Sequence, residues 1–204
     1  MFKIVRFDLL IRYTAFATVI ISIGIYALVQ TIWFPSLDLF KVITISSVVS
    51  TIIFVALLSP FFARKIWAIW SVFDKSLFPD LNGTWEGKIT LEDEKVLIVR
   101  AAIRQSLLAT QIDMHGETTK SITLETTPTI EQGQKKLYYV YRSTPKNPLW
   151  PSYNGSTLFD VRTIKQDGNI RLELTGHYYT DRKTVGRIEI FQTSSDENND
   201  VSFY

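Results

Sequence analysis

Hydrophobic and polar positions follow two different patterns along the chain. Residues 13–34 and 42–63 are runs without a charged side chain, and only the segment PSLDLFK separates them. From residue 80 onward, apolar and polar residues alternate instead, in short segments divided by turn-forming residues. Period-two alternation is typical of half-buried β-strands, whereas long uncharged apolar runs favour helices. The chain therefore predicts a helical N-terminal part and an all-β C-terminal part.

The two uncharged runs have the length of membrane spans. As a helix, each would be about 33 Å long, enough to cross a hydrocarbon core of about 30 Å. Positive charges precede the first run at Lys3, Arg6 and Arg12, and follow the second at Arg64 and Lys65. The positive-inside rule then places both termini in the cytoplasm. We predict a multi-pass membrane protein, and not a cleaved signal peptide, because a second span follows the first directly.

Small polar residues recur inside both predicted spans. Thr14, Thr18 and Ser22 are spaced by four residues, as are Ser46 and Ser50. Such stripes allow helices to approach closely in lipid. Two interpretations follow and both stay open: the stripes pack the two helices of one chain together, or they pack helices of neighbouring chains.

The pattern divides the chain into four parts. Residues 1–63 form a transmembrane hairpin, and residues 64–79 a helical juxtamembrane connector that ends at Pro79. Residues 80–193 form the β domain, and residues 194–204 an acidic tail that we expect to be disordered.

Eight segments of the β domain have strand character. Eight antiparallel strands close into a barrel that can hold one small ligand. We therefore predict a membrane-anchored all-β protein, with two N-terminal transmembrane α-helices and a C-terminal eight-stranded antiparallel, lipocalin-like β-barrel. The predicted strands are Thr84–Leu91, Val96–Gln105, Leu107–Met114, Thr119–Thr126, Lys136–Arg142, Ser156–Ile164, Ile170–Thr175 and Thr184–Gln192.

Composition and motifs argue against several functional classes. The net charge of +2 gives no reason to expect a nucleic-acid polymer as partner. The chain has no cysteine and two histidines, so we expect no disulfide, no metal site and no cofactor. It contains no nucleotide-binding or hydrolase motif. Two enzymatic alternatives remain: His177 could act as a base, or Asp160 and Glu173 could act as paired carboxylates. Because such residues are more often structural, we predict that the protein is not an enzyme.

Aromatic and basic residues cluster in two segments of the β domain. Aromatic ring faces can stack on nucleobases, and arginine can pair with phosphate. The alternative is a tyrosine-filled core beside a solvated basic turn. The candidate ligand-binding residues are Tyr141, Arg142, Tyr179, Thr180 and Arg182, with Arg104, Ser121 and Trp85 as second-tier candidates.

Four segments carry a resemblance to a known family. They are LNGTWEGKI at 81–89, VLIVRAAIRQS at 96–106, TKSITL at 119–124 and GHYYTDRKTVGRIEI at 176–190. Together with the two predicted spans, they resemble the CD-NTase-associated protein 15 family, which comprises SMODS-associated effectors with two transmembrane helices and a β-strand-rich domain. The resemblance covers nearly the whole chain.

The resemblance implies a role in CBASS antiphage defence. A cognate nucleotidyltransferase would make a cyclic dinucleotide, and the cytosolic barrel would bind it. Protomers would then form a homo-oligomer, and the helices would disrupt the lipid bilayer of the bacterial inner membrane, so that the infected cell dies. An alternative from another class is a membrane-tethered, lipocalin-like carrier of a small apolar ligand, which would need a wholly apolar barrel interior.

Overall fold

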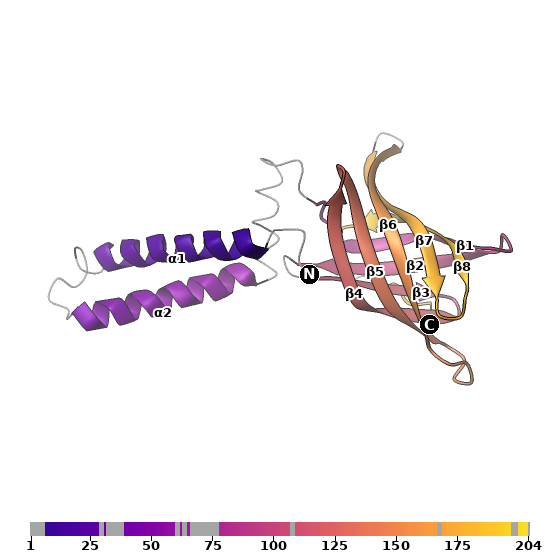
Figure 1. Cartoon of the computed structure of the whole chain (residues 1–204), viewed down its shortest axis with the longest axis horizontal. Coiled ribbons are helices and arrows are strands. Elements are labelled where there is room, and N and C mark those ends of the chain that lie inside the picture. The colour runs from indigo at the N-terminus through magenta and orange to yellow at the C-terminus, as the bar shows by residue number, and fades with distance from the viewer. Residues whose placement is uncertain are drawn as a thin grey trace. The chain divides into compact units, whose positions relative to one another are not determined.

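The computed structural model describes residues 7–28, 31, 39–59, 62, 65, 78–106, 109–166, 169–196 and 200–203. The chain forms two compact units, one over residues 5–76 and the other mainly over residues 77–204. The first unit is helical and the second is a β-barrel (Figure 1). The division into a helical and an all-β part is as the hydrophobic pattern indicates.

Two helices pack against each other through serine hydroxyls. Helix α1 spans Phe7–Leu28 and α2 spans Leu39–Leu58. The Ser22 and Ser50 hydroxyls are 2.7 Å apart, and the Ser46 hydroxyl donates a 2.7 Å hydrogen bond to the Ser22 carbonyl. Both α2 serines are buried. Of the two interpretations of the small-residue stripes, packing within one hairpin is thus confirmed for these serines.

Within the part of the chain that the structure describes, no helix has the combined length and apolar character of a membrane span. The predicted connector, residues 64–79, lies outside the described residues except at Lys65, Phe78 and Pro79.

Eight antiparallel strands form a closed barrel (Figure 1). Each strand pairs with the next along the chain, and β1 pairs with β8 to close the sheet. The prediction of an eight-stranded antiparallel barrel is confirmed. The strands are β1 Gly83–Leu91, β2 Val96–Gln105, β3 Thr110–Gly116, β4 Thr119–Glu131, β5 Gln134–Pro145, β6 Tyr153–Gln166, β7 Asn169–Thr180 and β8 Val185–Ser194.

The segment that leads into β1 closes one end of the barrel. Phe78 and Leu81 are buried there. The Asn82 side-chain oxygen accepts a 2.6 Å hydrogen bond from the Gln105 amide, and its nitrogen donates to the Gln105 carbonyl at 3.0 Å. The Trp85 indole donates to the Leu81 carbonyl at 3.0 Å. We call this the closed end. The opposite end, where the turn between β1 and β2 lies, is the open end.

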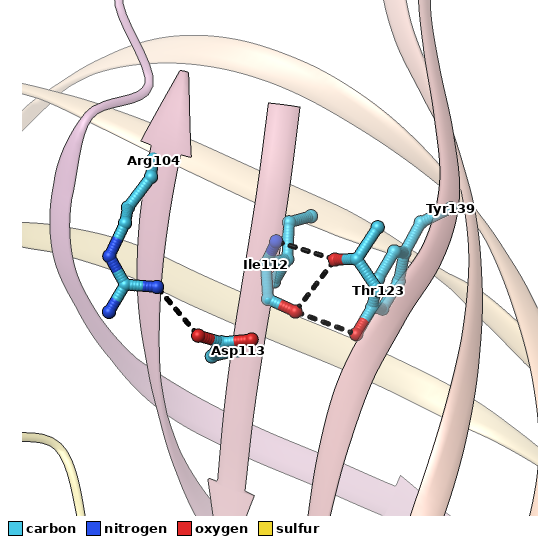
Figure 2. A network of polar contacts seen from close by, with 5 residues as sticks. All are labelled: Arg104, Ile112, Asp113, Thr123 and Tyr139. Atoms are coloured by element: carbon cyan, nitrogen blue, oxygen red, sulfur yellow. Dashed lines mark hydrogen bonds and ion pairs between the residues drawn. The ribbon is translucent and has the colours of Figure 1, made fainter. Parts of the chain in front are cut away.

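Side-chain hydroxyls complete the seam between β3 and β4. Backbone register pairs join the two strands only at residues 114–115 with 120–121. Closer to the closed end, the Thr123 hydroxyl accepts a 2.7 Å hydrogen bond from the Ile112 amide and donates one of 2.9 Å to the Ile112 carbonyl. The Tyr139 hydroxyl donates to the same carbonyl at 3.2 Å (Figure 2). This part of the barrel wall therefore depends on side chains.

Part of the predicted tail lies against the barrel. The last strand ends at Ser194, and residues 200–203 have no regular secondary structure. Val201 is buried, and the guanidinium carbon of Arg100 lies 4.7 Å from the centre of the Phe203 ring. Residues 200–203 thus differ from the disordered tail that the acidic composition predicts, because two apolar side chains find a surface to pack on.

Candidate functional site

A cavity of about 210 Å³ occupies the barrel interior at the open end. Inward-facing positions of all eight strands, or of the turns beside them, line it, because successive side chains of a strand point to opposite faces. The lining is mixed in chemistry, with hydroxyls, aromatic rings, aliphatic side chains and one guanidinium. It comprises Ile89, Leu91, Leu97, Val99, Met114, Gly116, Thr119, Ser121, Tyr139, Tyr141, Ser143, Tyr153, Tyr178, Thr180, Arg182, Thr184 and Ile188.

Two stacked tyrosines of β5 form part of the wall. Tyr139 and Tyr141 are two residues apart, so both point inward. Their ring centres are 4.9 Å apart, with 25° between the ring planes. Phe159 continues the stack, with its ring centre 6.1 Å from that of Tyr139. The result is a rigid aromatic surface that leads from the cavity towards the closed end.

Glycines on neighbouring strands make room for two tyrosine rings. Gly155 is the register partner of Tyr141, and a Cβ atom at Gly155 would lie 2.4 Å from Tyr141 Cζ. Gly186 is the register partner of Tyr178, and a Cβ atom there would lie 2.5 Å from Tyr178 Cε1. The rings therefore lie over bare backbone. A side chain at either glycine would therefore clash with a ring that lines the cavity.

Burial keeps the tyrosine hydroxyls neutral. Desolvation raises the pKa of Tyr139 and Tyr141 well above the ordinary tyrosine value. Desolvation also raises the pKa of Tyr178, and the nearby Tyr153, Glu92 and Asp93 add to that effect. A neutral phenol both donates and accepts hydrogen bonds. The cavity thus presents uncharged groups that suit the polar edges of a ligand.

Arg182 stands at the mouth of the cavity. It lies in the turn between β7 and β8, where Lys183 has a positive φ of 62°. The guanidinium donates a hydrogen bond to the Pro151 carbonyl and lies 4.3 Å from the centre of the Tyr153 ring. Among the described residues that line the cavity, Arg182 alone carries a charge. Because a guanidinium has five N–H groups, it retains donors for an anion at the mouth.

Four of the predicted binding residues meet in this cavity. Tyr141, Ser121, Thr180 and Arg182 all line it, although they come from different parts of the barrel. Tyr141 and Ser121 are buried, whereas Arg182 is exposed at the mouth. The structure therefore brings together a ring, two hydroxyls and a cation at one cavity.

The other four predicted residues lie elsewhere. Arg142 and Tyr179 face outward, and Tyr179 is 56% exposed. Arg104 also faces outward and forms a 2.6 Å ion pair with Asp113 (Figure 2). Trp85 is buried near the closed end and does not line the cavity. The physical reason is the two-residue period of a strand, which sends Arg142 and Tyr179 away from their inward neighbours.

The same period identifies cavity residues that the sequence analysis missed. If Tyr141 points inward, then Tyr139 and Ser143 must as well, and all three line the cavity. Likewise, if Thr180 points inward, then Tyr178, two residues earlier in β7, must point inward too, and both line the cavity. Consistent use of the alternation, anchored on one buried residue per strand, would have found them. Tyr153 could not be found in this way, because it begins a strand that we expected to start later.

The residues of the enzymatic alternatives do not gather at the cavity. His177 is exposed on the outside of β7. Asp160 forms a 2.7 Å ion pair with Lys136, also on the outer surface. Glu173 is the register partner of Arg162. Within the described residues, no three His, Asp or Glu side chains form a group that could hold a metal ion.

Comparison with known proteins gives one family. Residues 76–192 match the family model described as "Cap15, cyclic dinucleotide receptor domain". The match covers 117 of the 204 residues, from before β1 into β8. No curated protein matches the chain.

Proposed function

The chain belongs to the Cap15 family, whose matched domain is described as a cyclic dinucleotide receptor, and we propose that its barrel binds a cyclic dinucleotide in the open-end cavity. The observation that carries this proposal is the stacked pair of Tyr139 and Tyr141 inside a cavity whose mouth holds Arg182. A cyclic dinucleotide combines flat bases with two phosphates. Rings stack on bases, and a guanidinium pairs with phosphate.

The size of the cavity suggests how the ligand is oriented. Its volume of about 210 Å³ is below the range of roughly 300–1,000 Å³ that is usual for ligand pockets. A ligand with two nucleosides would therefore fill the cavity and project from its mouth. We propose that one base enters the barrel towards Tyr141, while a phosphate stays at the mouth beside Arg182.

The mixed lining favours a cyclic dinucleotide over the small apolar ligand of the alternative, lipocalin-like carrier. A carrier of an apolar ligand needs an apolar interior. Here five aliphatic hydroxyls (Thr119, Ser121, Ser143, Thr180 and Thr184) line the cavity together with four tyrosines. Three of these hydroxyls already have partners in the barrel, since Ser121 donates to the Met114 carbonyl and Thr180 bonds with Thr184. The interior is nevertheless not the wholly apolar one that such a carrier needs.

We further propose that the protein acts by binding and assembly, not by catalysis. The two uncharged runs, 13–34 and 42–63, would anchor it in the bacterial inner membrane with the barrel in the cytoplasm. Ligand binding would drive the protomers to oligomerise, and the helices would then disrupt the bilayer as a CBASS effector does. What supports this is the family, the flanking charges and the packed α1–α2 hairpin.

Calorimetry with matched arginine variants tests the binding site. The full chain in detergent is titrated with cyclic dinucleotides of adenine, guanine and uracil in all pairings. We expect Arg182→Ala to weaken binding about 10- to 100-fold, as loss of a charge-assisted hydrogen bond does. Arg142→Ala is the control, because this exposed arginine faces outward from the same barrel. No binding by the parent, or an equal loss in both variants, would overturn the proposal.

A test of the output uses the same protein in vesicles. The full chain is reconstituted into dye-loaded liposomes, and the cyclic dinucleotide that binds best is added. We expect dye release with the parent chain and little release with Arg182→Ala at a concentration that saturates only the parent. Chromatography of the nucleotide after the experiment should recover it unchanged. Binding without dye release would refute the membrane step, and degradation of the nucleotide would refute the purely binding role.

A further inference from the structure

We propose that the outward face of β5 and β6, flanked by β4 and β7, is the surface through which two copies of this chain associate. This inference rests on the proposed function, in which ligand binding leads to assembly, and it names the surface that assembly uses. Two properties of the barrel exterior support it: an apolar patch over four strands, and a charge pattern that is complementary to itself.

Both sides of the barrel exterior carry ion pairs, and on β5 and β6 these are Lys136–Asp160 at 2.7 Å and Arg162–Asp160 at 3.8 Å, at one end of the face. On β1, β2, β3 and β8, outward side chains form four further ion pairs. They are Lys88–Glu189 at 3.3 Å, Arg187–Glu189 at 2.7 Å, Arg100–Glu86 at 3.2 Å and Arg104–Asp113 at 2.6 Å.

On the opposite side, apolar side chains form a patch over four strands. The register places Val140 and Tyr179 in one row on either side of Ser156, and Tyr138 beside Leu158 in the next row. Leu124 sits at the irregularity of β4 beside the first row. Outward side chains in adjacent rows lie side by side, and polar residues interrupt the patch at Glu125 and Ser156, the register partners of Val140, and at His177, the register partner of Leu158. Its members are Ile122, Leu124, Tyr138, Val140, Leu158 and Tyr179, each 38–56% exposed.

The patch is complementary to itself about a line between β5 and β6. Tyr138 on β5 lies opposite Leu158 on β6, and Lys136 lies opposite Asp160. A two-fold axis along the strands exchanges β5 of one copy with β6 of the other. Tyr138 of one copy then meets Leu158 of the second, and Lys136 meets the second copy's Asp160. This is an isologous contact, in which the same patch serves both copies.

The charges also select this arrangement over its alternative. A two-fold axis across the strands would instead bring Lys136 of one copy towards Arg142 of the other, since the two residues stand at opposite ends of the patch on β5. Like charges in contact destabilise such a pair. With the axis along the strands, two lysines and two aspartates form one alternating cluster at the interface.

The size of the patch suggests a weak contact. From the spacing of strands and residues, two rows over four strands cover an area of roughly 300 Å². This is less than the roughly 800 Å² that each partner of a stable complex buries. The convex barrel brings the central strands β5 and β6 closest together. Such a contact becomes effective when copies are confined together, as anchoring in one membrane would do. Freely diffusing barrels should therefore associate poorly.

Energy transfer between labelled full-length chains in liposomes tests the surface. Donor- and acceptor-labelled copies are mixed at a fixed protein-to-lipid ratio, with and without the cyclic dinucleotide that calorimetry selects. We expect Leu158→Asp to reduce association at least tenfold. Ile98→Asp is the matched control, because Ile98 is 52% exposed on the outside of β2. Equal association of Leu158→Asp and the parent would overturn the inference.

Reversing the charge of Lys136 or Asp160 distinguishes an ion pair between two copies from the ion pair within one copy. Lys136→Glu and Asp160→Lys should each fail to self-associate, because each leaves like charges across the axis. A mixture of the two variants should associate, since the carboxylate introduced in one copy would then face the ammonium introduced in the other. If the charges act only within a chain, the mixture will remain as dispersed as the single variants, and the surface is wrong. Both variants should still bind the nucleotide; absence of binding by the parent would instead refute the proposed function.

Discussion

Replacing Thr123 by valine tests whether hydroxyls hold the barrel wall together. Valine keeps the shape of threonine and removes only the hydroxyl. That hydroxyl accepts the Ile112 amide at 2.7 Å and donates to the Ile112 carbonyl at 2.9 Å, where β3 and β4 lack backbone pairing (Figure 2). The carbonyl keeps the Tyr139 hydroxyl as a donor, at 3.2 Å. The amide loses the partner that the structure gives it on the β4 side.

The expected cost follows from these contacts. Ile112 is fully buried, and an unsatisfied buried donor costs about 1–3 kcal/mol. Loss of the second, weaker bond adds about 0.5–1 kcal/mol. Thr123→Val should therefore lower the free energy of unfolding by about 1.5–4 kcal/mol, which corresponds to a fall in Tm of roughly 5–15 °C.

Denaturant unfolding of the full chain in detergent, followed by near-ultraviolet circular dichroism, measures this loss. Thr123→Ser is the control, because serine keeps both hydrogen bonds and loses a methyl group worth about 0.8 kcal/mol or less. Hydrogen exchange of the Ile112 amide should accelerate in the valine variant alone. If valine and serine variants unfold within about 0.5 kcal/mol of each other, the hydroxyl does not hold the seam.

Three further predictions concern the cavity and the hairpin. Gly155→Ala should displace the Tyr141 ring and weaken nucleotide binding at least tenfold by calorimetry, with an unchanged far-ultraviolet spectrum; unchanged affinity would contradict the account of the cavity. Because burial raises the pKa of Tyr139 above its unfolded value of about 10, its stabilisation is fully present below pH 10 and is lost as the pH rises further. Thermal unfolding between pH 8 and 11 should show a smaller alkaline loss for Tyr139→Phe than for the parent, and equal losses would argue against this. Ser50→Leu should increase the spin-label distance between α1 and α2, whereas Ser47→Leu, at an exposed position, should not; equal distances would refute the serine contact.

The eight strands and the barrel could be predicted because their pattern is local. Alternation along Val96–Gln105 already shows which side chains share a face, and turn residues mark where a strand ends. The hairpin of serine-bearing helices was predictable for the same reason. What the pattern left open was the assignment of faces. Tyr141 and Arg142 were both proposed to contact the ligand, although neighbours in a strand point to opposite sides.

The sequence by itself determined the all-β domain, its strand number and the aromatic and basic residue types available for a ligand. Only the tertiary structure decided which end of the barrel is open, because residues 78–82 close the other end through contacts with residue 105. It also decided that Gly155 faces Tyr141, and that Thr123 replaces backbone pairing in the seam. These features depend on register between strands that are distant along the chain. A two-residue period is the same for every register, so it does not determine which side chains of separate strands meet.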